Sequence, residues 1–551
     1  MASTLEIPVA AGLSARRRWW WVAPLLLAML VYLVLALWLA DTKAPWYDEG
    51  QYTNSAYNLA FRGNMGSNVV EPTGFYQNVY YRGVQQWTYF ELPNHILAMA
   101  AWIRIFGFSA FTARSYSICW GAVTLAVLFF LLQRAFPDRR VATLGTLFTA
   151  IDFIFLWSSA DTRMDVPANA LALGSLSAYL YFREKDLWKA VLASQVLGAG
   201  AVFTHPNTLL VLLGGALLAW RHDRNRLRIG WPRYLALGAA PYALLALMWG
   251  VYILQNPADF KAQFIPALQG HDFERFRIFT RPYAAVGEEI HRHLAAYCAS
   301  GLWGGAMRGW MGLVLFFYLA AIIWFFWNWR RQEEPVRMFR EYAIVMLLGM
   351  TFLNGFKGYF YLIYLAPIYN SILAAWLLSL GRAGFDRKCL AVAIGAAFAG
   401  LQLTISIVHI RADEYHRDYQ PAIRDLARDR AQGKSIVGDA ALGFGLDFSG
   451  FTDDVRLGMY SGRSPDVIVV DRAYRRYSGL YRKEEPAVFR HIITALSRNY
   501  RLTAQYGSFW IFERAQPGPD GRVTPWVDAR IMENLPDMDD TVWLVPRDFQ
   551  R

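Results

Sequence analysis

The feature that most constrains this chain is a series of long apolar runs separated by short polar breaks. The first run, residues 19–40, contains no charged residue and is long enough to cross a bilayer as one helix. Ten further apolar runs follow it before residue 411. The predicted spans lie near 19–40, 111–135, 141–160, 166–182, 187–204, 207–220, 234–254, 303–327, 341–355, 359–380 and 389–410. This pattern predicts a polytopic α-helical membrane protein with about 11 transmembrane helices.

Composition divides the chain into a membrane part and a soluble part. Only 18% of the 551 residues are charged, whereas soluble domains carry about 25%. The shortage is concentrated before residue 411, and the composition after it is that of an ordinary soluble domain. We therefore expect a cytoplasmic N-terminus at 1–18, a membrane domain at 19–410 and a small α/β domain at 411–551. The membrane domain has two long external loops, at about 41–110 and 255–302.

The basic residues indicate how the chain crosses the membrane. Net charge is +12, and the basic clusters occur at alternate breaks, as at Arg16–Arg18, Arg139–Arg140 and Arg330–Arg331. The intervening breaks carry more acid, so the positive-inside rule places the N-terminus in the cytoplasm. An odd number of spans then places the C-terminal domain outside. The charge is explained by topology, and no nucleic-acid partner is expected.

Two short helices are predicted in the first external loop. Tyr52, Ala56 and Leu59 share one face of a helix over residues 50–62. Pro93 suits the first position of a second helix, which would end at Gly107. We expect both helices to lie in the outer membrane interface.

Acidic side chains gather at the outer ends of the predicted spans. Asp48 and Glu49 follow the first span directly, Glu91 lies before the second interfacial helix, and Asp165 lies between spans three and four. A positioned carboxylate can remove a proton from a substrate, and ionised groups at membrane depth are often functional. We predict catalytic roles for Asp48, Asp165 and Glu49. The alternatives are a solvated Glu49 and an Asp165 that only forms a salt bridge with Arg163.

The three cysteines and the glycine pattern point to no further chemistry. Cys119, Cys298 and Cys389 lack metal-ligand spacing, so neither a disulfide framework nor a zinc site is supported. Gly443 and Gly445 lack the third glycine and the βαβ context of a nucleotide-binding loop.

The order of several short motifs resembles a known family. Asp-Glu follows span one, Glu91-Leu92-Pro93 opens the second interfacial helix, and Arg114 starts span two. Arg163-Met164-Asp165 follows span three, and Tyr364-Leu365-Ala366-Pro367 comes late in the bundle. Over residues 15–410 this order resembles the GT-C membrane glycosyltransferases. Within them it is similar to the protein O-mannosyltransferase and aminoarabinose–lipid A transferase group, which includes the rhizobial galacturonosyltransferases.

The resemblance implies an inverting glycosyltransferase in a bacterial cytoplasmic (inner) membrane. Such enzymes move a sugar from a polyprenyl-phosphate donor to an envelope lipid, polysaccharide or protein at the outer face. The resemblance assigns the general base to Asp48 and places Asp165 and Glu91 beside it. In the aminoarabinose branch these acids surround a divalent metal ion, which makes Glu91, Asp48 and Asp165 candidate metal ligands. Tyr364 would approach the donor phosphate.

The chain departs from that branch where cations handle phosphate. Leu92, Pro93 and Asn94 stand where that branch has a lysine and two prolines, and His205-Pro206 stands where many family members carry a lysine and a glycine. These departures argue against the aminoarabinose reaction and require another donor-phosphate site.

Cations or hydrogen-bond donors must stabilise the phosphate as it leaves the sugar. The predicted phosphate-binding residues are Lys357, Tyr364, His205, Arg163 and Arg62, with Arg281 as a further candidate. Lys357 is favoured because it lies at the outer end of span ten, although a lysine there can also simply reach the interface. Arg163 can alternatively orient Asp165.

The soluble domain is predicted from short strands and helices. Residues 421–431 indicate a helix, 435–438 and 465–471 indicate buried strands, and 500–505 with 508–513 indicate a hairpin around Gly507. We expect this domain to cover the membrane site or to help select the acceptor.

Three other functions are compatible with parts of the sequence. A transporter or lipid flippase would place its polar site near mid-membrane and often shows internal repeats, whereas these acids lie at span ends. An envelope scaffold would tolerate joint replacement of Asp48, Glu91 and Asp165. A polymerase or ligase using lipid-linked oligosaccharides stays within the enzyme class. The sequence favours the glycosyltransferase.

Overall fold

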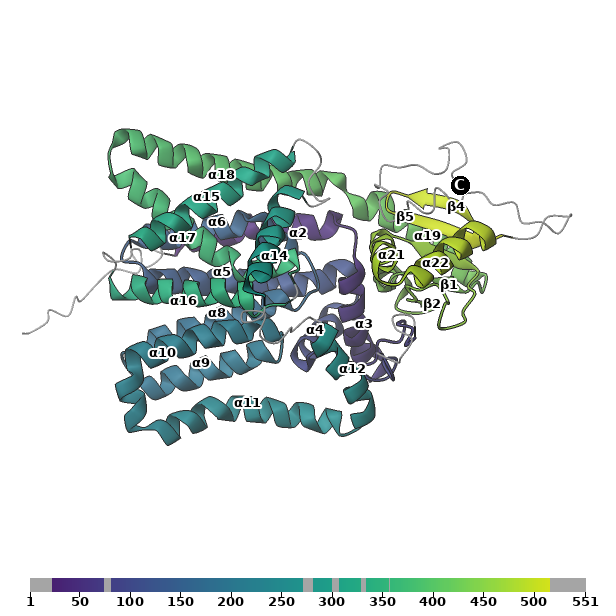
Figure 1. Ribbon diagram of the computed structural model, residues 1–551, viewed down its shortest axis with the longest axis horizontal. Helices are drawn as coiled ribbons and strands as arrows, with labels where there is room; N and C mark the ends of the chain where they lie inside the picture. The colour runs from purple at the N-terminus through teal and green to yellow at the C-terminus, as the bar shows by residue number, and fades with distance from the viewer. Residues whose placement is uncertain are drawn as a thin grey trace, which may run out of the picture.

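The computed structural model describes residues 22–73, 81–270, 281–299, 307–328, 333–355 and 357–515. The expected cytoplasmic segment 1–18 lies outside these residues. Figure 1 shows a helical bundle followed by a smaller region that contains the sheet. The sheet has five strands, and the predicted fold class is confirmed.

Every predicted span coincides with a helix or a helix pair. The bundle helices are α2 (Ala23–Thr42), α5 (Ala110–Ala135), α6 (Arg139–Ile151), α7 (Phe153–Ser159), α8 (Asp165–Phe182), α9 (Leu187–Val202), α10 (Leu209–Ile229), α11 (Trp231–Ile253), α15 (Met307–Trp327), α16 (Glu334–Phe352), α17 (Ala366–Arg382) and α18 (Phe385–Ala412). By length and composition, five described helices can cross a membrane, or six if the bent pair α6–α7 is one span. The chain is an integral membrane protein, and the count of eleven spans stays a prediction.

Burial differs strongly between the bundle helices. The core contains buried side chains of α2, α5, α6, α7, α8 and α17, whereas α11 has no buried residue. A helix that is apolar around its whole circumference and unburied by protein suits a lipid environment. Short 3₁₀ turns precede two bundle helices: η1 (Pro206–Thr208) lies before α10, and η4 (Tyr359–Tyr364) before α17.

Both long loops contain helices, and the two in the first loop were predicted. In the first loop, α3 (Tyr47–Arg62) follows α2, and α4 (Pro93–Phe106) begins at its proline and ends at Gly107, whose φ is +84°. A positive φ favours glycine, which explains why the helix ends there. The second loop contains α12 (Pro257–Gly270), α14 (Pro282–Leu294) and the π turn η2 (Ala295–Ala299).

The C-terminal elements confirm the predicted α/β character. The strands are β1 (Ile436–Val437), β2 (Phe451–Thr452), β3 (Val467–Val470), β4 (Tyr500–Tyr506) and β5 (Phe509–Arg514), in the order β2-β1-β3-β5-β4. The first three strands run parallel, and β4–β5 is the expected hairpin, turning at Gly507. The helical elements are η5 (Tyr415–Tyr419), α19 (Gln420–Ala431), η6 (Ala440–Leu442), α20 (Gly443–Leu446), α21 (Arg472–Glu484) and α22 (Pro486–Asn499).

Helix α3 lies between the bundle and the C-terminal sheet region (Figure 1). A Cβ atom added at Gly50, in the first turn of α3, would lie 2.2 Å from the backbone of Ala440 and Ala441. At the other end of α3, Arg62 donates hydrogen bonds to the carbonyl oxygens of Asp447 and Phe448, each over 3.2 Å. The C-terminal region therefore contacts the helix that carries Asp48.

Candidate active site

The first turn of α3 carries both Asp48 and Glu49, but the structure places their side chains differently. Glu49 is fully buried, and both of its carboxylate oxygens accept hydrogen bonds of 2.8 Å from Arg114 of α5. Arg114 Nη1 also donates to the carbonyl oxygens of Ala40 and Lys43, at the end of α2. Glu49 thus fixes the junction of α2, α3 and α5, and it is not the solvated acid that the sequence left open.

Asp48 is joined to Asp165 through one arginine. Arg163 Nε donates to Asp165 Oδ2 over 2.8 Å, and Arg163 Nη1 donates to Asp48 Oδ2. The side chains of Arg163 and Asp165 are 2% and 1% exposed, whereas that of Asp48 is 22% exposed. Asp48 is therefore the carboxylate of this group that a substrate can reach.

An aromatic enclosure holds the Arg163 guanidinium in place. It lies 3.8 Å from the ring centre of Phe360 and 5.6 Å from those of Trp46 and Tyr52. A guanidinium over aromatic faces gains cation–π attraction, which increases when water is excluded. Phe360 comes from η4, so this turn and α3 enclose the arginine together.

His205 and Tyr364 lie on the other side of Asp165. His205 Nε2 is 3.7 Å from Asp165 Oδ1, and its ring lies 6.2 Å from that of Tyr364 and 5.4 Å from that of Tyr361. The backbone N–H of Asn207 donates to His205 Nδ1 over 3.2 Å. The structure thus brings the predicted residues His205, Tyr364, Arg163, Asp165 and Asp48 into one cluster.

Glu91 is a buried acid close to this cluster. It is 3% exposed, and its nearest hydrogen-bond partner is the Ser55 hydroxyl, 3.5 Å from Oε2. Burial raises the pKa of Glu91 well above its usual value of 4.5, and the charge of Asp48 adds to the rise. Glu91 is therefore an acid that resists ionisation.

Glu91 should make the protein less stable as pH rises. Because its pKa is higher in the folded state, the proton that it binds stabilises the fold at low pH. That contribution is lost as pH rises from the usual carboxyl range through the raised pKa. We compare the melting temperatures of wild type and Glu91→Gln. The difference, wild type minus variant, should decrease as the pH is raised from 4.5 to 8. A difference that is constant with pH would contradict the raised pKa.

Lys357, the favoured phosphate ligand, already has an internal partner. Its Nζ donates to Glu289 Oε2 over 3.1 Å and to the carbonyl oxygens of Thr351 and Met350 over 2.7 and 2.5 Å. Burial lowers the pKa of Lys357 to about 8, against the opposing effect of Glu289. Lys357 lies only three positions before Phe360 in the chain, but its charge is directed to Glu289 of α14.

Arg62 and Arg281 are not placed with the cluster. Asp48 and Arg62 lie at opposite ends of α3, about 20 Å apart at 1.5 Å per residue. Arg62 instead binds Asn58 and two backbone carbonyls of the C-terminal region. Arg281 is exposed at the start of α14. The prediction that Arg62 joins the phosphate site is corrected, because helix length separates it from Asp48.

The candidate metal ligands Glu91, Asp48 and Asp165 do not form a metal site. Among the described residues, no group of three or more His, Cys, Asp or Glu side chains could hold a metal ion. Arg163 lies between Asp48 and Asp165 and places a guanidinium where the two carboxylates face each other. These acids as arranged do not fit a shared divalent ion, and no step is derived through one.

Some contacts of the site were not predicted from the sequence. Lys43 Nζ pairs with the buried Asp161, and Trp46 Nε1 donates to the same carboxylate over 3.1 Å. Lys43 and Trp46 lie just before the Asp48-Glu49 motif, and Asp161 lies just before Arg163-Met164-Asp165. This closeness to the motifs was the only signal in the sequence. Tyr477 of α21 also reaches the site, with its ring 5.2 Å from that of Tyr47. Nothing in the sequence links a position so far along the chain to Asp48.

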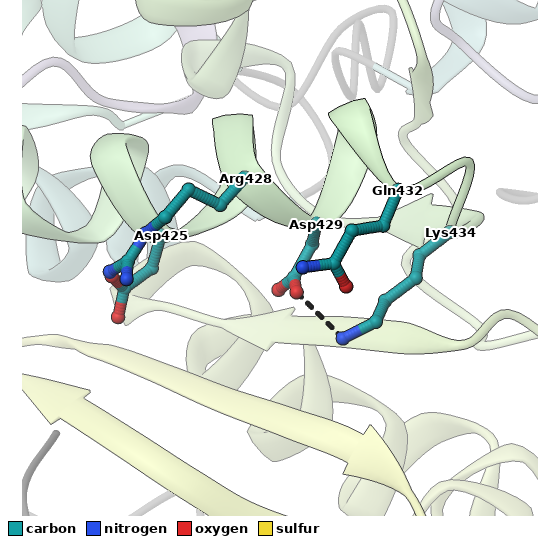
Figure 2. A pocket seen from close by; sticks show the side chains of 5 residues that line it. All are labelled: Asp425, Arg428, Asp429, Gln432 and Lys434. Carbon is teal, nitrogen blue, oxygen red and sulfur yellow. Dashed lines mark hydrogen bonds and ion pairs between the residues drawn. The ribbon is translucent and has the colours of Figure 1, made fainter.

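A separate surface pocket lies on α19, on the C-terminal region, and Figure 2 shows its lining. Asp425, Arg428, Asp429, Gln432 and Lys434 line it. Lys434 donates to Asp429 over 2.7 Å and Arg428 pairs with Asp425, so its charges are matched within the pocket. We therefore place the chemistry at the Asp48 cluster.

Comparison with known proteins identifies a related family profile and similar folds. Residues 93–249 match the profile of the dolichyl-phosphate-mannose-protein mannosyltransferase family. No curated protein matches the sequence. The fold is similar to that of ArnT from Cupriavidus metallidurans bound to undecaprenyl phosphate, at 14% identity and a TM-score of 0.56. That alignment covers 89% of this chain and 98% of ArnT.

Similar structures also include an archaeal enzyme. The oligosaccharyltransferase AglB from Archaeoglobus fulgidus, in complex with an inhibitory peptide and a dolichol-phosphate, aligns at 12% identity and a TM-score of 0.53 over 91% of this chain and 75% of AglB. A complex of the Archaeoglobus fulgidus enzyme with Zn and sulfate aligns at 13% identity and a TM-score of 0.55, over 89% of this chain and 73% of that one. The family match and the shared fold confirm the predicted resemblance to GT-C membrane glycosyltransferases.

Proposed function

From this GT-C fold and the Asp48 cluster, we propose that the chain is an inverting, polyprenyl-phosphate-dependent glycosyltransferase. It moves a sugar from the lipid phosphate to a hydroxyl of an envelope acceptor, at the outer face of a bacterial cytoplasmic membrane. The ArnT and AglB structures, which hold undecaprenyl phosphate and dolichol-phosphate, support a lipid phosphate as the donor group. In this proposal residues 19–410 form the catalytic membrane domain and 411–551 an extracytoplasmic domain.

One observation carries the assignment of the base. Asp48 is 22% exposed, whereas Glu49, Glu91 and Asp165 are all buried. In a single displacement, the acceptor hydroxyl attacks the anomeric carbon and transfers its proton to Asp48. The bond between that carbon and the lipid phosphate oxygen breaks, and the phosphate leaves with the electron pair. A carboxylate positioned in this way typically contributes about 10²–10⁴-fold to the rate.

The neighbouring buried residues are given positioning roles. Arg163, fixed by Asp165 and by the aromatic rings, orients the Asp48 carboxylate. Glu49 and Arg114 hold the first turn of α3 in place. His205 and Tyr364, which are 4% and 1% exposed, are assigned as hydrogen-bond donors to a phosphate oxygen that enters the cluster with the bound donor. Pre-positioned donors of this kind stabilise charge that develops on a leaving group.

Release of polyprenyl phosphate tests this function. The purified protein is incubated with a panel of polyprenyl-phosphate sugars and an envelope lipid extract, and free polyprenyl phosphate is measured with and without the extract. Acceptor-dependent release supports the proposal. If no donor is turned over but the sugar lipid crosses the membrane of proteoliposomes, the protein is a flippase and the proposal is wrong.

A further inference from the structure

We propose that the C-terminal region completes the active site: Tyr477 covers the Asp48 end of α3, and Arg476 binds an anionic group of the substrate. This inference rests on the proposed function, because it assigns substrate contacts at the same site. It gives the C-terminal region a direct part in binding, beyond a covering role.

The first step of the argument is the contact between α3 and the C-terminal region. The backbone at Ala440 and Ala441 follows β1, and it lies so close to Gly50 that no side chain fits between them. Along the same edge of the sheet, Asp453 follows β2, and its backbone N–H donates to the Val69 carbonyl over 2.7 Å. The ends of two parallel strands are thus fixed against the first external loop, close to Asp48.

The second step is the position of Tyr477 on α21, the helix that follows β3. Its ring meets that of Tyr47 edge to face, at 5.2 Å and 65°. The Tyr47 hydroxyl in turn accepts a 2.6 Å hydrogen bond from Gln51 Nε2, which fixes its ring against α3. Burial raises the pKa of Tyr477 well above its usual value, and the negative charge of Asp48 is the next largest cause. Tyr477 therefore lies within the electrostatic reach of the proposed base.

The third step separates Arg476 from the other arginines of α21. Arg472 forms a two-pronged ion pair with Glu414, at 2.7 and 3.0 Å. Arg475 is buried over the ring of Trp510, at 4.7 Å. Arg476 is exposed and forms no ion pair with a carboxylate in the described part of the chain. Its role in the fold is therefore smaller than that of Arg472 or Arg475.

Arg476 lies beside the site because it directly precedes Tyr477 on α21, and the Tyr477 ring meets that of Tyr47 at 5.2 Å. Tyr47 in turn directly precedes Asp48 at the start of α3. An exposed guanidinium beside the site can form charge-assisted, two-pronged hydrogen bonds with a phosphate or a carboxylate. That group belongs either to the lipid donor or to an acidic acceptor, and kinetics can distinguish the two.

The test is Arg476→Gln in the full-length protein, with Arg490→Gln as the matched control. Arg490 is exposed on α22, so it reports the general effect of removing a surface charge. Hydrogen bonds to charged groups contribute about 1.5–3 kcal/mol, so losing them should raise one KM by about tenfold or more. An increase for the donor assigns the anion to the lipid phosphate, and an increase for the acceptor assigns it to the acceptor. If both KM values match those of Arg490→Gln, the inference is wrong, although wild-type turnover would still support the proposed function.

A second variant, Gly50→Ala, tests the contact between α3 and the C-terminal region. Alanine favours a helix over glycine by about 0.5–1 kcal/mol, so α3 itself should not be weakened. The added methyl group would push against the Ala440–Ala441 backbone and separate Tyr477 and Arg476 from Asp48. We expect a large loss of kcat/KM while the bundle remains folded. Full activity in Gly50→Ala would show that the C-terminal region is not needed at the site.

Discussion

Replacement of Asp48 by asparagine is expected to lower the rate of polyprenyl phosphate release by about 10²–10⁴-fold. Asparagine has nearly the same shape but cannot accept the proton of the acceptor hydroxyl. Of the four acids of the site, Asp48 has the side chain that reaches solvent, so no neighbour can readily take over its role. The loss should appear mainly in kcat, because proton transfer belongs to the transition state.

A matched control is Glu184→Gln, which removes a carboxylate that is 67% exposed and forms only loose ion pairs. It should retain wild-type activity. The melting temperature of Asp48→Asn must also be measured, because the substitution removes one partner of Arg163. Equal release by wild type and by a folded Asp48→Asn variant would exclude Asp48 as the base and direct attention to Asp165 and Glu91.

Replacement of Arg114 by methionine is expected to cause the largest loss of stability, about 3–5 kcal/mol. The change leaves the fully buried Glu49 carboxylate without the two hydrogen bonds of 2.8 Å that neutralise it. It also removes the donors to the last carbonyls of α2. Thermal unfolding in detergent measures the effect, and activity should fall with it because α3 carries Asp48.

Arg134→Met on the same helix is the control for this prediction. Arg134 is 45% exposed, and its ion pair with Glu184 is 3.6 Å long, so an effect below about 1 kcal/mol is expected. The double variant Glu49→Gln with Arg114→Met should be less destabilised than Arg114→Met alone, because no buried charge is left unpaired. If Arg114→Met is as stable as Arg134→Met, the buried pair does not hold the site together.

Local sequence signals predicted the elements of this fold well. An uncharged apolar run has few alternatives to a buried or membrane helix, and α4 begins and ends at its proline and glycine because each fixes the backbone. The hairpin at Gly507 follows from the same chemistry. The order of the short motifs was enough to predict the resemblance to GT-C glycosyltransferases that the shared fold confirms.

Pairings between distant side chains could not be predicted in the same way. Arg163 donates a hydrogen bond to Asp48, which lies 115 residues earlier in the chain. Lys357 donates one to Glu289, which lies 68 residues earlier. Which cation meets which acid depends on how the helices pack, and a sequence gives only the candidates. The favoured Lys357 illustrates the limit, because the sequence gives its place in the chain but not its pairing with Glu289. Tyr477 could not be found at all, because its relation to α3 depends on how the C-terminal region docks.

The most direct test of the central claim is the anomeric configuration of the newly formed glycosidic bond, measured by NMR on the product of a donor of known configuration. A single displacement with Asp48 as base predicts inversion at the anomeric carbon in every turnover. A product with retained configuration would contradict this account, because it requires a covalent or dissociative route in which Asp48 does not simply accept the acceptor's proton.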